Sequence, residues 1–437
     1  MNTQTKNTQT DNKPAQPSLG EATKIWAKIG LLSFGGPAAQ IALMHQLIVD
    51  KMRWMKEQDF LNALSFCMLL PGPEAMQLVT YAGWKLHGRL GGIIAGLLFV
   101  LPGALVILAL GATYALLGDV PLIQALFLGV KAAVLIVVIE ALLKISKRAL
   151  KGNTLKVLAV IAFIGIFFFS IPYPLIVLVA ALFGFFRADK QSAEKALMVS
   201  KPKGVSQLFI TIIIGLAVWW VPLFLVDAFS DQAILSQLGT FFSKLAVVTF
   251  GGAYAVLAYM GQDVVSHWGW LSAEEMMDGL GLAETTPGPL ILVTEFVGFL
   301  AAFREEGSLM MGIAGASITL WATFIPCFLW IFAGAPYIEW ISAQPRLKGA
   351  LEAISAAVVG VILNLSVWFA LHVMFKQVSK TEHGWLTLWQ PEFASIDWRV
   401  VALTLLSGFL ALKLHWSIVK VLLISSLLGA GMVYAGL

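Results

Sequence analysis

Two short motifs of glycine and proline each occur twice in the chain. Phe34-Gly35-Gly36-Pro37 returns as Phe250-Gly251-Gly252-Ala253, and Pro71-Gly72-Pro73 returns as Pro287-Gly288-Pro289, both at the same offset along the chain. Proline suits the first turn of a helix, where its missing N–H would have no partner anyway. A helix that begins at such a motif presents free backbone N–H groups and a partial positive charge, and both attract anions. The four motifs therefore predict a shared anion site, with simple close packing of helices as the alternative.

Two lysines stand at matching places before the Phe-Gly-Gly sequences. Lys28 and Lys244 each lie six residues upstream, in apolar surroundings. A charged side chain at membrane depth is costly and is by default a functional candidate. An ammonium group near anion-binding helix starts would attract the anion and help to neutralise it. The alternative is that both side chains extend along apolar surface to reach water.

Carboxyl, amide and hydroxyl side chains accompany the motifs. Glu74 directly follows the first Pro-Gly-Pro, where it either satisfies backbone donors or exchanges a proton with the anion. Asp59 and Glu275, which are related by the same offset, are expected to cap the following helices. The amides and hydroxyls suit an oxygen-rich ligand, or equally link helices to one another. The predicted substrate-binding residues are Lys28, Phe34, Gly35, Gly36, Pro37, Gln40, Pro71, Gly72, Pro73, Glu74, Gln77, Lys244, Phe250, Gly251, Gly252, Thr286, Pro287, Gly288, Pro289 and Glu295.

Signatures of catalysis and of cofactor binding are missing from the sequence. The six histidines show no metal-ligand spacing, and no phosphate-cradling Gly-x-x-x-x-Gly-Lys motif occurs. No serine elbow and no His-Glu-x-x-His sequence is present. We therefore expect no enzyme activity, no cofactor, no metal and no nucleic-acid partner. A membrane enzyme acting on a lipid phosphate and a uniport channel are the alternatives from other classes.

The composition places these motifs in a membrane protein. The 437 residues are 59% hydrophobic and 12% charged, with a mean hydropathy of +0.83, whereas soluble domains carry roughly 25% charged residues. We expect an all-α polytopic membrane protein. Its apolar segments are predicted at 21–48, 60–84, 90–117, 120–143, 154–170, 172–186, 206–226, 240–262, 276–302, 307–334, 347–375, 398–412 and 416–436.

The segment 206–226 has no counterpart in the repeat and separates two sets of six segments. One unpaired crossing would turn the second half upside down, which is a recurrent transporter design. The loops 144–156 and 187–203 are basic and are therefore expected on the cytoplasmic side, together with the N-terminus. A parallel duplication is the alternative. The predicted domains are a disordered tail (1–19), a first membrane repeat (20–187), a linker with the unpaired helix (188–239) and a second repeat (240–437).

The loop after the first segment complicates simple spanning, because Lys51, Arg53 and Lys56 would then lie outside. Two interpretations stay open. Segments 21–48 and 60–84 are either broken spanning helices or re-entrant hairpins bent at their motifs. Half-segments of about 13 residues reach roughly 20 Å at 1.5 Å per residue, enough to enter the hydrocarbon core but not to cross it. Hairpins would return the basic loop to the cytoplasmic side.

The sequences Phe34–Ile41 and Leu70–Ala75, with their copies Thr249–Gly252 and Thr286–Pro289, resemble the signatures of the chromate ion transporter (CHR) family. The resemblance is to its long two-domain members and covers nearly the whole chain from about residue 20. It implies export of chromate from the bacterial cytoplasm, resistance to chromate, and energy from the membrane potential or proton gradient. Sulfate, a dianion of similar shape, is the implied competitor, and a sulfate-type oxyanion carrier is the alternative function. The expected location is a bacterial inner membrane, with the bilayer as partner and a homodimer left open.

Overall fold

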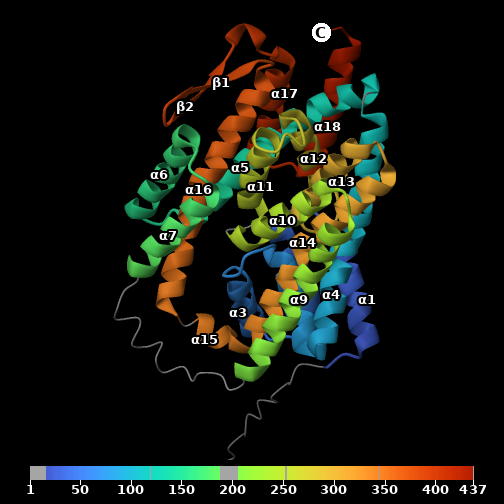
Figure 1. Cartoon of the computed structure of the whole chain (residues 1–437), viewed down its shortest axis with the longest axis vertical. Coiled ribbons are helices and arrows are strands. Elements are labelled where there is room, and N and C mark those ends of the chain that lie inside the picture. The colour runs from blue at the N-terminus through green and yellow to red at the C-terminus, as the bar shows by residue number, and fades with distance from the viewer. Residues whose placement is uncertain (1–15, 119, 188–204, 251–252, 343, 437) are drawn as a thin grey trace, which may run out of the picture.

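The computed structural model describes residues 16–118, 120–187, 205–250, 253–342 and 344–436 (Figure 1). The predicted tail (1–19) lies mostly outside the described residues, as do most of the basic loop 187–203 and both Gly251 and Gly252. Helices make up nearly all of the described chain. Five of them are long and apolar enough to cross a membrane. The chain is thus an all-α membrane protein, as the sequence predicts.

The first half begins with short helices that end at the repeated motifs. Its elements are α1 (Leu19–Leu32), α2 (Gly36–Met44), the π-helix η1 (His45–Lys51), α3 (Glu57–Cys67), α4 (Glu74–Leu117), α5 (Pro121–Ala149), α6 (Asn153–Phe169) and α7 (Tyr173–Arg187). A capping box between Ser18 and Glu21 starts α1. The breaks between α1 and α2, and between α3 and α4, coincide with the two predicted motifs.

The second half repeats this order after the unpaired helix α9 (Val205–Phe229). Its elements are α10 (Ala233–Val248), α11 (Ala253–Ser266), α12 (Ala273–Thr285), η2 (Leu290–Leu292), α13 (Val293–Glu306), α14 (Leu309–Gly334), η3 (Ala335–Tyr337), α15 (Ile338–Ser342), α16 (Pro345–Met374), β1 (Val378–His383), β2 (Leu386–Pro391), η4 (Phe393–Ser395), α17 (Trp398–Gly408), η5 (Phe409–Lys413) and α18 (Ile418–Tyr434). Ser272 and Glu275 form a capping box at the start of α12, so Glu275 is a cap as predicted.

The 44-residue helix α4 is in fact two helices that fold back on each other. The backbone leaves helical geometry at His87 (φ −135°) and Gly88 (φ 60°). Beyond this kink the two arms touch, because a side chain at Gly83 would meet the carbonyl oxygen of Gly91 at 2.3 Å. In the second half α13 and α14 pack in the same way, and a side chain at Gly298 would meet the carbonyl oxygen of Gly315 at 2.8 Å. Each half thus contains a closely packed helical hairpin made possible by small residues.

These hairpins favour the re-entrant interpretation of the broken segments. The 14 residues of α1 extend about 21 Å at 1.5 Å per residue, which is short of the roughly 30 Å of a hydrocarbon core. α3 packs against α15, which lies at the same end of the molecule as the start of α1 (Figure 1). Re-entrant segments would return the loop with Lys51, Arg53 and Lys56 to the end from which α1 enters and would remove the predicted conflict with positive charge. This interpretation stays a prediction.

The two halves are inverted with respect to each other. In Figure 1 the second arm of α4 runs toward the upper end, which carries the β1–β2 hairpin, whereas its counterpart α14 runs away from it. Lys151 and Arg187 lie together at the lower end, where they line a cavity with Glu352. We call this end the basic face. The opposite end, the hairpin face, includes the turn before α7, since Ser170 Oγ lies 3.0 Å from Thr387 Oγ1 on β2. The sequence did not predict this antiparallel β hairpin.

Candidate functional site

The broken helices of the two halves are joined to each other at the repeated motifs. The Gly72 N–H donates to the Thr249 carbonyl at 2.9 Å, and the Gly288 N–H donates to the Ser33 carbonyl at 2.8 Å. Ser33 and Thr249 are equivalent positions of the repeat, as are Gly72 and Gly288. Each Pro-Gly-Pro turn is therefore bonded to the Phe-Gly-Gly break of the other half. This exchange joins the four breaks in two pairs, each of which contains one break from either half.

The backbone at these breaks requires glycine. Gly35 and Gly36 have φ values of +85° and +79°, and Gly72 and Gly288 have +119° and +90°. Residues with a Cβ rarely adopt this left-handed region. At Gly72 a side chain would in addition meet Cys327 Sγ at 2.8 Å. The glycines thus allow the left-handed backbone conformations with which the chain turns sharply at the breaks.

The hydroxyls of Ser33 and Thr249 bond in the same way within their own helices. Ser33 Oγ donates to the Ile29 carbonyl at 2.6 Å, and Thr249 Oγ1 donates to the Leu245 carbonyl. Both hydroxyl donors are thereby used at helix ends, where four backbone carbonyls otherwise lack partners. The two breaks are built alike, although Gly251 and Gly252 themselves lie outside the described residues.

Helix starts lie beside the breaks as predicted. α2 begins at Gly36 with Pro37 in its first turn, and α4 begins directly after Pro73. Neither helix has a side chain that caps its first turn. Pro289 likewise precedes η2. The first N–H groups of α2 and α4 therefore have no side-chain acceptor, which is the property that suits a helix start to an anion.

The two glutamines use their amide groups to hold the breaks together. Gln40 Nε2 donates to the Gly288 carbonyl at 2.7 Å, and Gln77 Nε2 donates to the Pro71 carbonyl at 2.6 Å. Both Oε1 atoms are buried, and the described part of the chain offers them no hydrogen-bond partner. Thr286 is buried and donates to the Ala283 carbonyl at 3.0 Å. These contacts link backbone segments at the breaks, while a role of the three side chains in substrate binding stays a prediction.

Acids and one arginine surround the breaks. Glu295 is 1% exposed, and its Oε2 has no hydrogen-bond partner among the described residues. Glu284 is buried and accepts the Tyr254 hydroxyl at 2.8 Å. Arg148, at the end of α5, lies with Nη2 2.8 Å from Met68 Sδ and within electrostatic reach of Glu74. Sequence reasoning had placed Arg148 only in a basic loop, because nothing local indicates that α5 ends beside the break before α4.

Lys28 and Lys244 occupy equivalent positions on their helices. Both side chains are exposed, whereas Trp26 and Ile29 on α1 are fully buried. Lys28 thus lies on the side of α1 that faces away from the buried core. Lys244 acts electrostatically on Asp263 of α11. A shared role of the two lysines in substrate binding stays a prediction. Phe34 is 43% exposed beside its break, and Phe250 and Pro287 are partly buried beside theirs.

Comparison with known proteins gives consistent matches over most of the chain. A family model described as chromate transporter matches residues 21–185 and 236–431, one region in each half. A probable chromate transport protein from Synechococcus elongatus is 31% identical over 80% of this chain and 84% of its own length. Chromate transport proteins from Pseudomonas aeruginosa and Cupriavidus metallidurans are 32% and 28% identical, each over 81% of this chain and over 81% and 83% of their own lengths. No solved structure shows a significant match.

Proposed function

The chain belongs to the chromate transporter family, and we propose that it is a secondary active transporter that exports chromate across a bacterial inner membrane. The observation that carries this proposal is the reciprocal bonding of the four breaks, Gly72 to Thr249 and Gly288 to Ser33. These bonds tie breaks of one half, with the helix starts beside them, to breaks of the other half. Inverted repeats with interrupted helices are the arrangement in which transporters hold anionic groups at helix N-termini.

Charge supports both the orientation and the direction of transport. We place the basic face, with Lys151 and Arg187, in the cytoplasm, because cytoplasmic loops carry the excess of lysine and arginine. Moving a charge across the membrane potential is worth about 2.3 kcal/mol per 100 mV, so a dianion leaving a negative interior gains about twice that. Export of chromate would keep its cytoplasmic level low and thereby give resistance.

The site gives no basis for separating chromate from sulfate. Both are tetrahedral dianions, and the backbone N–H groups at the helix starts recognise negative charge and oxygen atoms, which the two anions share. We therefore propose sulfate as a competing ligand of the same site. Displacement of a dianion's water requires several donors at once, since an unpaired buried charge is very costly. The helix starts of α2 and α4 supply such donors.

The test is chromate uptake into inverted membrane vesicles that contain the protein. We expect uptake that saturates with chromate, falls when sulfate is added, and stops when the driving gradient is removed. The membrane potential and the pH gradient are collapsed separately by ionophores, so that the energy source is identified. Vesicles with a Gly288→Leu variant provide the matched control. Uptake no greater than in vesicles without the protein would refute the proposal.

A further inference from the structure

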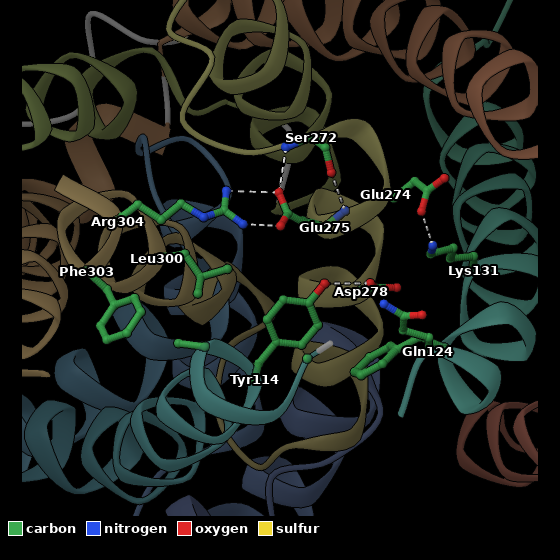
Figure 2. Close-up of a pocket in the computed structure, with 13 residues that line it drawn as sticks. Tyr114, Gln124, Lys131, Ser272, Glu274, Glu275, Asp278, Leu300, Phe303 and Arg304 are labelled. Carbon is green, nitrogen blue, oxygen red and sulfur yellow. Dashed lines mark hydrogen bonds and ion pairs between the residues drawn. The ribbon is translucent and has the colours of Figure 1, made fainter. Parts of the chain in front are cut away.

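A cavity of about 480 Å³ lies toward the hairpin face, between the ends of α4 and α13 and the starts of α5 and α12. Figure 2 shows that its wall is strongly polar. Lys131 Nζ lies 2.5 Å from Glu274 Oε2, and Arg304 is bonded to Glu275. Four charged lining residues are thus paired with one another, with one ion pair on each side of the cavity (Figure 2).

Asp278 lines the same cavity but has no ion pair among the described residues. Its side chain is 3% exposed, and the Tyr114 hydroxyl donates to Oδ2 at 2.8 Å. The other oxygen, Oδ1, is buried without a hydrogen-bond partner in the described part of the chain. The charged groups that act on Asp278 are Lys131 from α5 and Glu274 and Glu275 from α12 itself. Arg304 of α13 donates to Glu275.

A buried carboxylate that forms no ion pair is unstable relative to its protonated form. Removing an isolated ion from water costs several kcal/mol even after the protein relaxes, and such groups usually become neutral instead. Protonation would also place a hydrogen on Oδ1, which could donate it in a hydrogen bond or release it as a proton. The Tyr114 hydroxyl has the opposite effect, since it donates to and favours the charged form. Burial thus favours the protonated form of Asp278 and the Tyr114 hydroxyl favours the charged form, so the side chain can adopt either one.

The repeat shows that the fold does not require an acid at this position. The equivalent residue in the first half is Asn62, which is exposed on α3 and accepts the Gln58 amide at 3.0 Å. Glu284 and Glu295 likewise correspond to the uncharged Met68 and Val79. The second half thus carries three buried acids at positions where the first half has none.

We propose that Asp278 binds and releases the proton that is coupled to anion transport, and that this cavity connects it with the external solution. The inference rests on the proposed transport function and adds the coupling ion and its carrier. The carboxylate takes a proton from external water when the cavity is open and releases it toward the interior after the halves rearrange. Glu284, six residues nearer to the Thr286–Pro289 break and bonded to Tyr254, is the next acid along α12.

The experiment uses the full-length protein in liposomes and compares two transport modes. Exchange of labelled chromate against unlabelled chromate needs no net proton movement, whereas accumulation driven by an imposed pH gradient does. We expect Asp278→Asn to keep exchange and to lose the gradient-driven accumulation. Tyr114→Phe removes a donor to the charged carboxylate, so the pH dependence of accumulation should shift to higher pH. Asp231 is an exposed acid in the loop between α9 and α10, so Asp231→Asn is the matched control and should behave as wild type.

A second readout does not depend on transport. Infrared difference spectra between acidic and alkaline buffer should contain a carbonyl component from protonated Asp278 beside those of other acids such as Glu284, and Asp278→Asn should remove that one component. The inference is overturned if Asp278→Asn retains gradient-driven accumulation, if the wild type responds only to membrane potential, or if the carbonyl bands of the variant and the wild type are identical. If the wild type shows the Asp278 component but neither exchanges nor accumulates chromate, the proposed substrate is wrong while a proton-binding Asp278 stands.

Discussion

At Gly36 the backbone has a φ of +79°, and no atom lies within 4 Å of the place where a Cβ would stand. A substitution there is therefore strained by conformation alone and not by crowding. We expect Gly36→Ala to lower the free energy of unfolding by about 1–2 kcal/mol, the cost of the left-handed region for a residue with a Cβ. Thermal unfolding in detergent measures the loss. Gly431 in α18 also has open space but no positive φ, so Gly431→Ala should be neutral or stabilising. Equal effects at the two sites would contradict the strain at Gly36.

Lys28 and Lys244 offer a test of charge near the breaks. An ammonium that attracts the anion should affect substrate affinity more than folding. We expect Lys28→Gln and Lys244→Gln to raise the KM for chromate several-fold, with protein levels in the membrane unchanged. Lys→Arg should be milder but not harmless, because the guanidinium is larger and planar. Unchanged KM in both Gln variants would identify these residues as lysines that merely reach the interface.

His45 provides a pH-dependent contribution to stability near the basic face. Its Nε2 lies 2.6 Å from Glu57 Oε2 and its Nδ1 3.3 Å from Asp50 Oδ2. The hydrogen bond to Glu57 raises the pKa of His45 above its ordinary value, against the opposing effect of partial burial. The pair is exposed enough that it contributes only about 0.2–1 kcal/mol.

Since the folded pKa of His45 is the higher one, this stabilisation is fully present below about pH 6.5, the unfolded value, and disappears as pH rises through the folded pKa. The melting temperature of the wild type should therefore fall over that interval relative to His45→Gln. Parallel melting curves of the two proteins across the whole interval would show that the ion pair contributes nothing.

Among the elements, the helical hairpins depend most directly on small residues. Gly83 and Gly91 let the two arms of α4 touch, since a side chain at either position would meet a carbonyl oxygen of the other at 2.3 Å. We expect Gly83→Val to cost about 1–3 kcal/mol, as overpacking of a core usually does, and to reduce transport by displacing Gln77 and the break before α4. Gly20 on α1 is the control, because no atom lies within 4 Å of the place where its Cβ would stand. Gly20→Val should leave both the free energy of unfolding and the rate of transport nearly unchanged. Wild-type stability of Gly83→Val would contradict the folded-back arms.

The whole molecule is less symmetric than its repeat. α12 packs along α5, where a side chain at Gly281 would meet Val130 at 2.2 Å, and most of its residues are buried. The counterpart α3 instead exposes Asn62 and Leu61. If α3 became buried while α12 became exposed, the site of an inverted repeat would open to the other side of the membrane.

Inversion itself is tested by single cysteines, because the natural Cys67 and Cys327 are buried. Thr154, in the cavity of the basic face, and Asp231, in the loop between α9 and α10, are both exposed. We expect Thr154→Cys to react with a membrane-impermeant thiol reagent only in inverted vesicles, and Asp231→Cys only in right-side-out cells. Reaction of both from the same side would exclude the inverted arrangement.

The sequence alone determined where the helices break, because a break is a local property. Glycine at positive φ and proline at a helix start act over a short stretch of chain, and their recurrence at one constant offset identified both the repeat and most of the candidate site. Apolar length likewise predicted nearly all segments. What only the tertiary structure decided is which groups meet. The bond between Gly288 and Ser33, the fold-back at Gly88, the approach of Arg148 to Met68 and the isolation of Asp278 in its cavity all join residues far apart in the chain. Such contacts depend on how whole helices pack, and no local pattern encodes them.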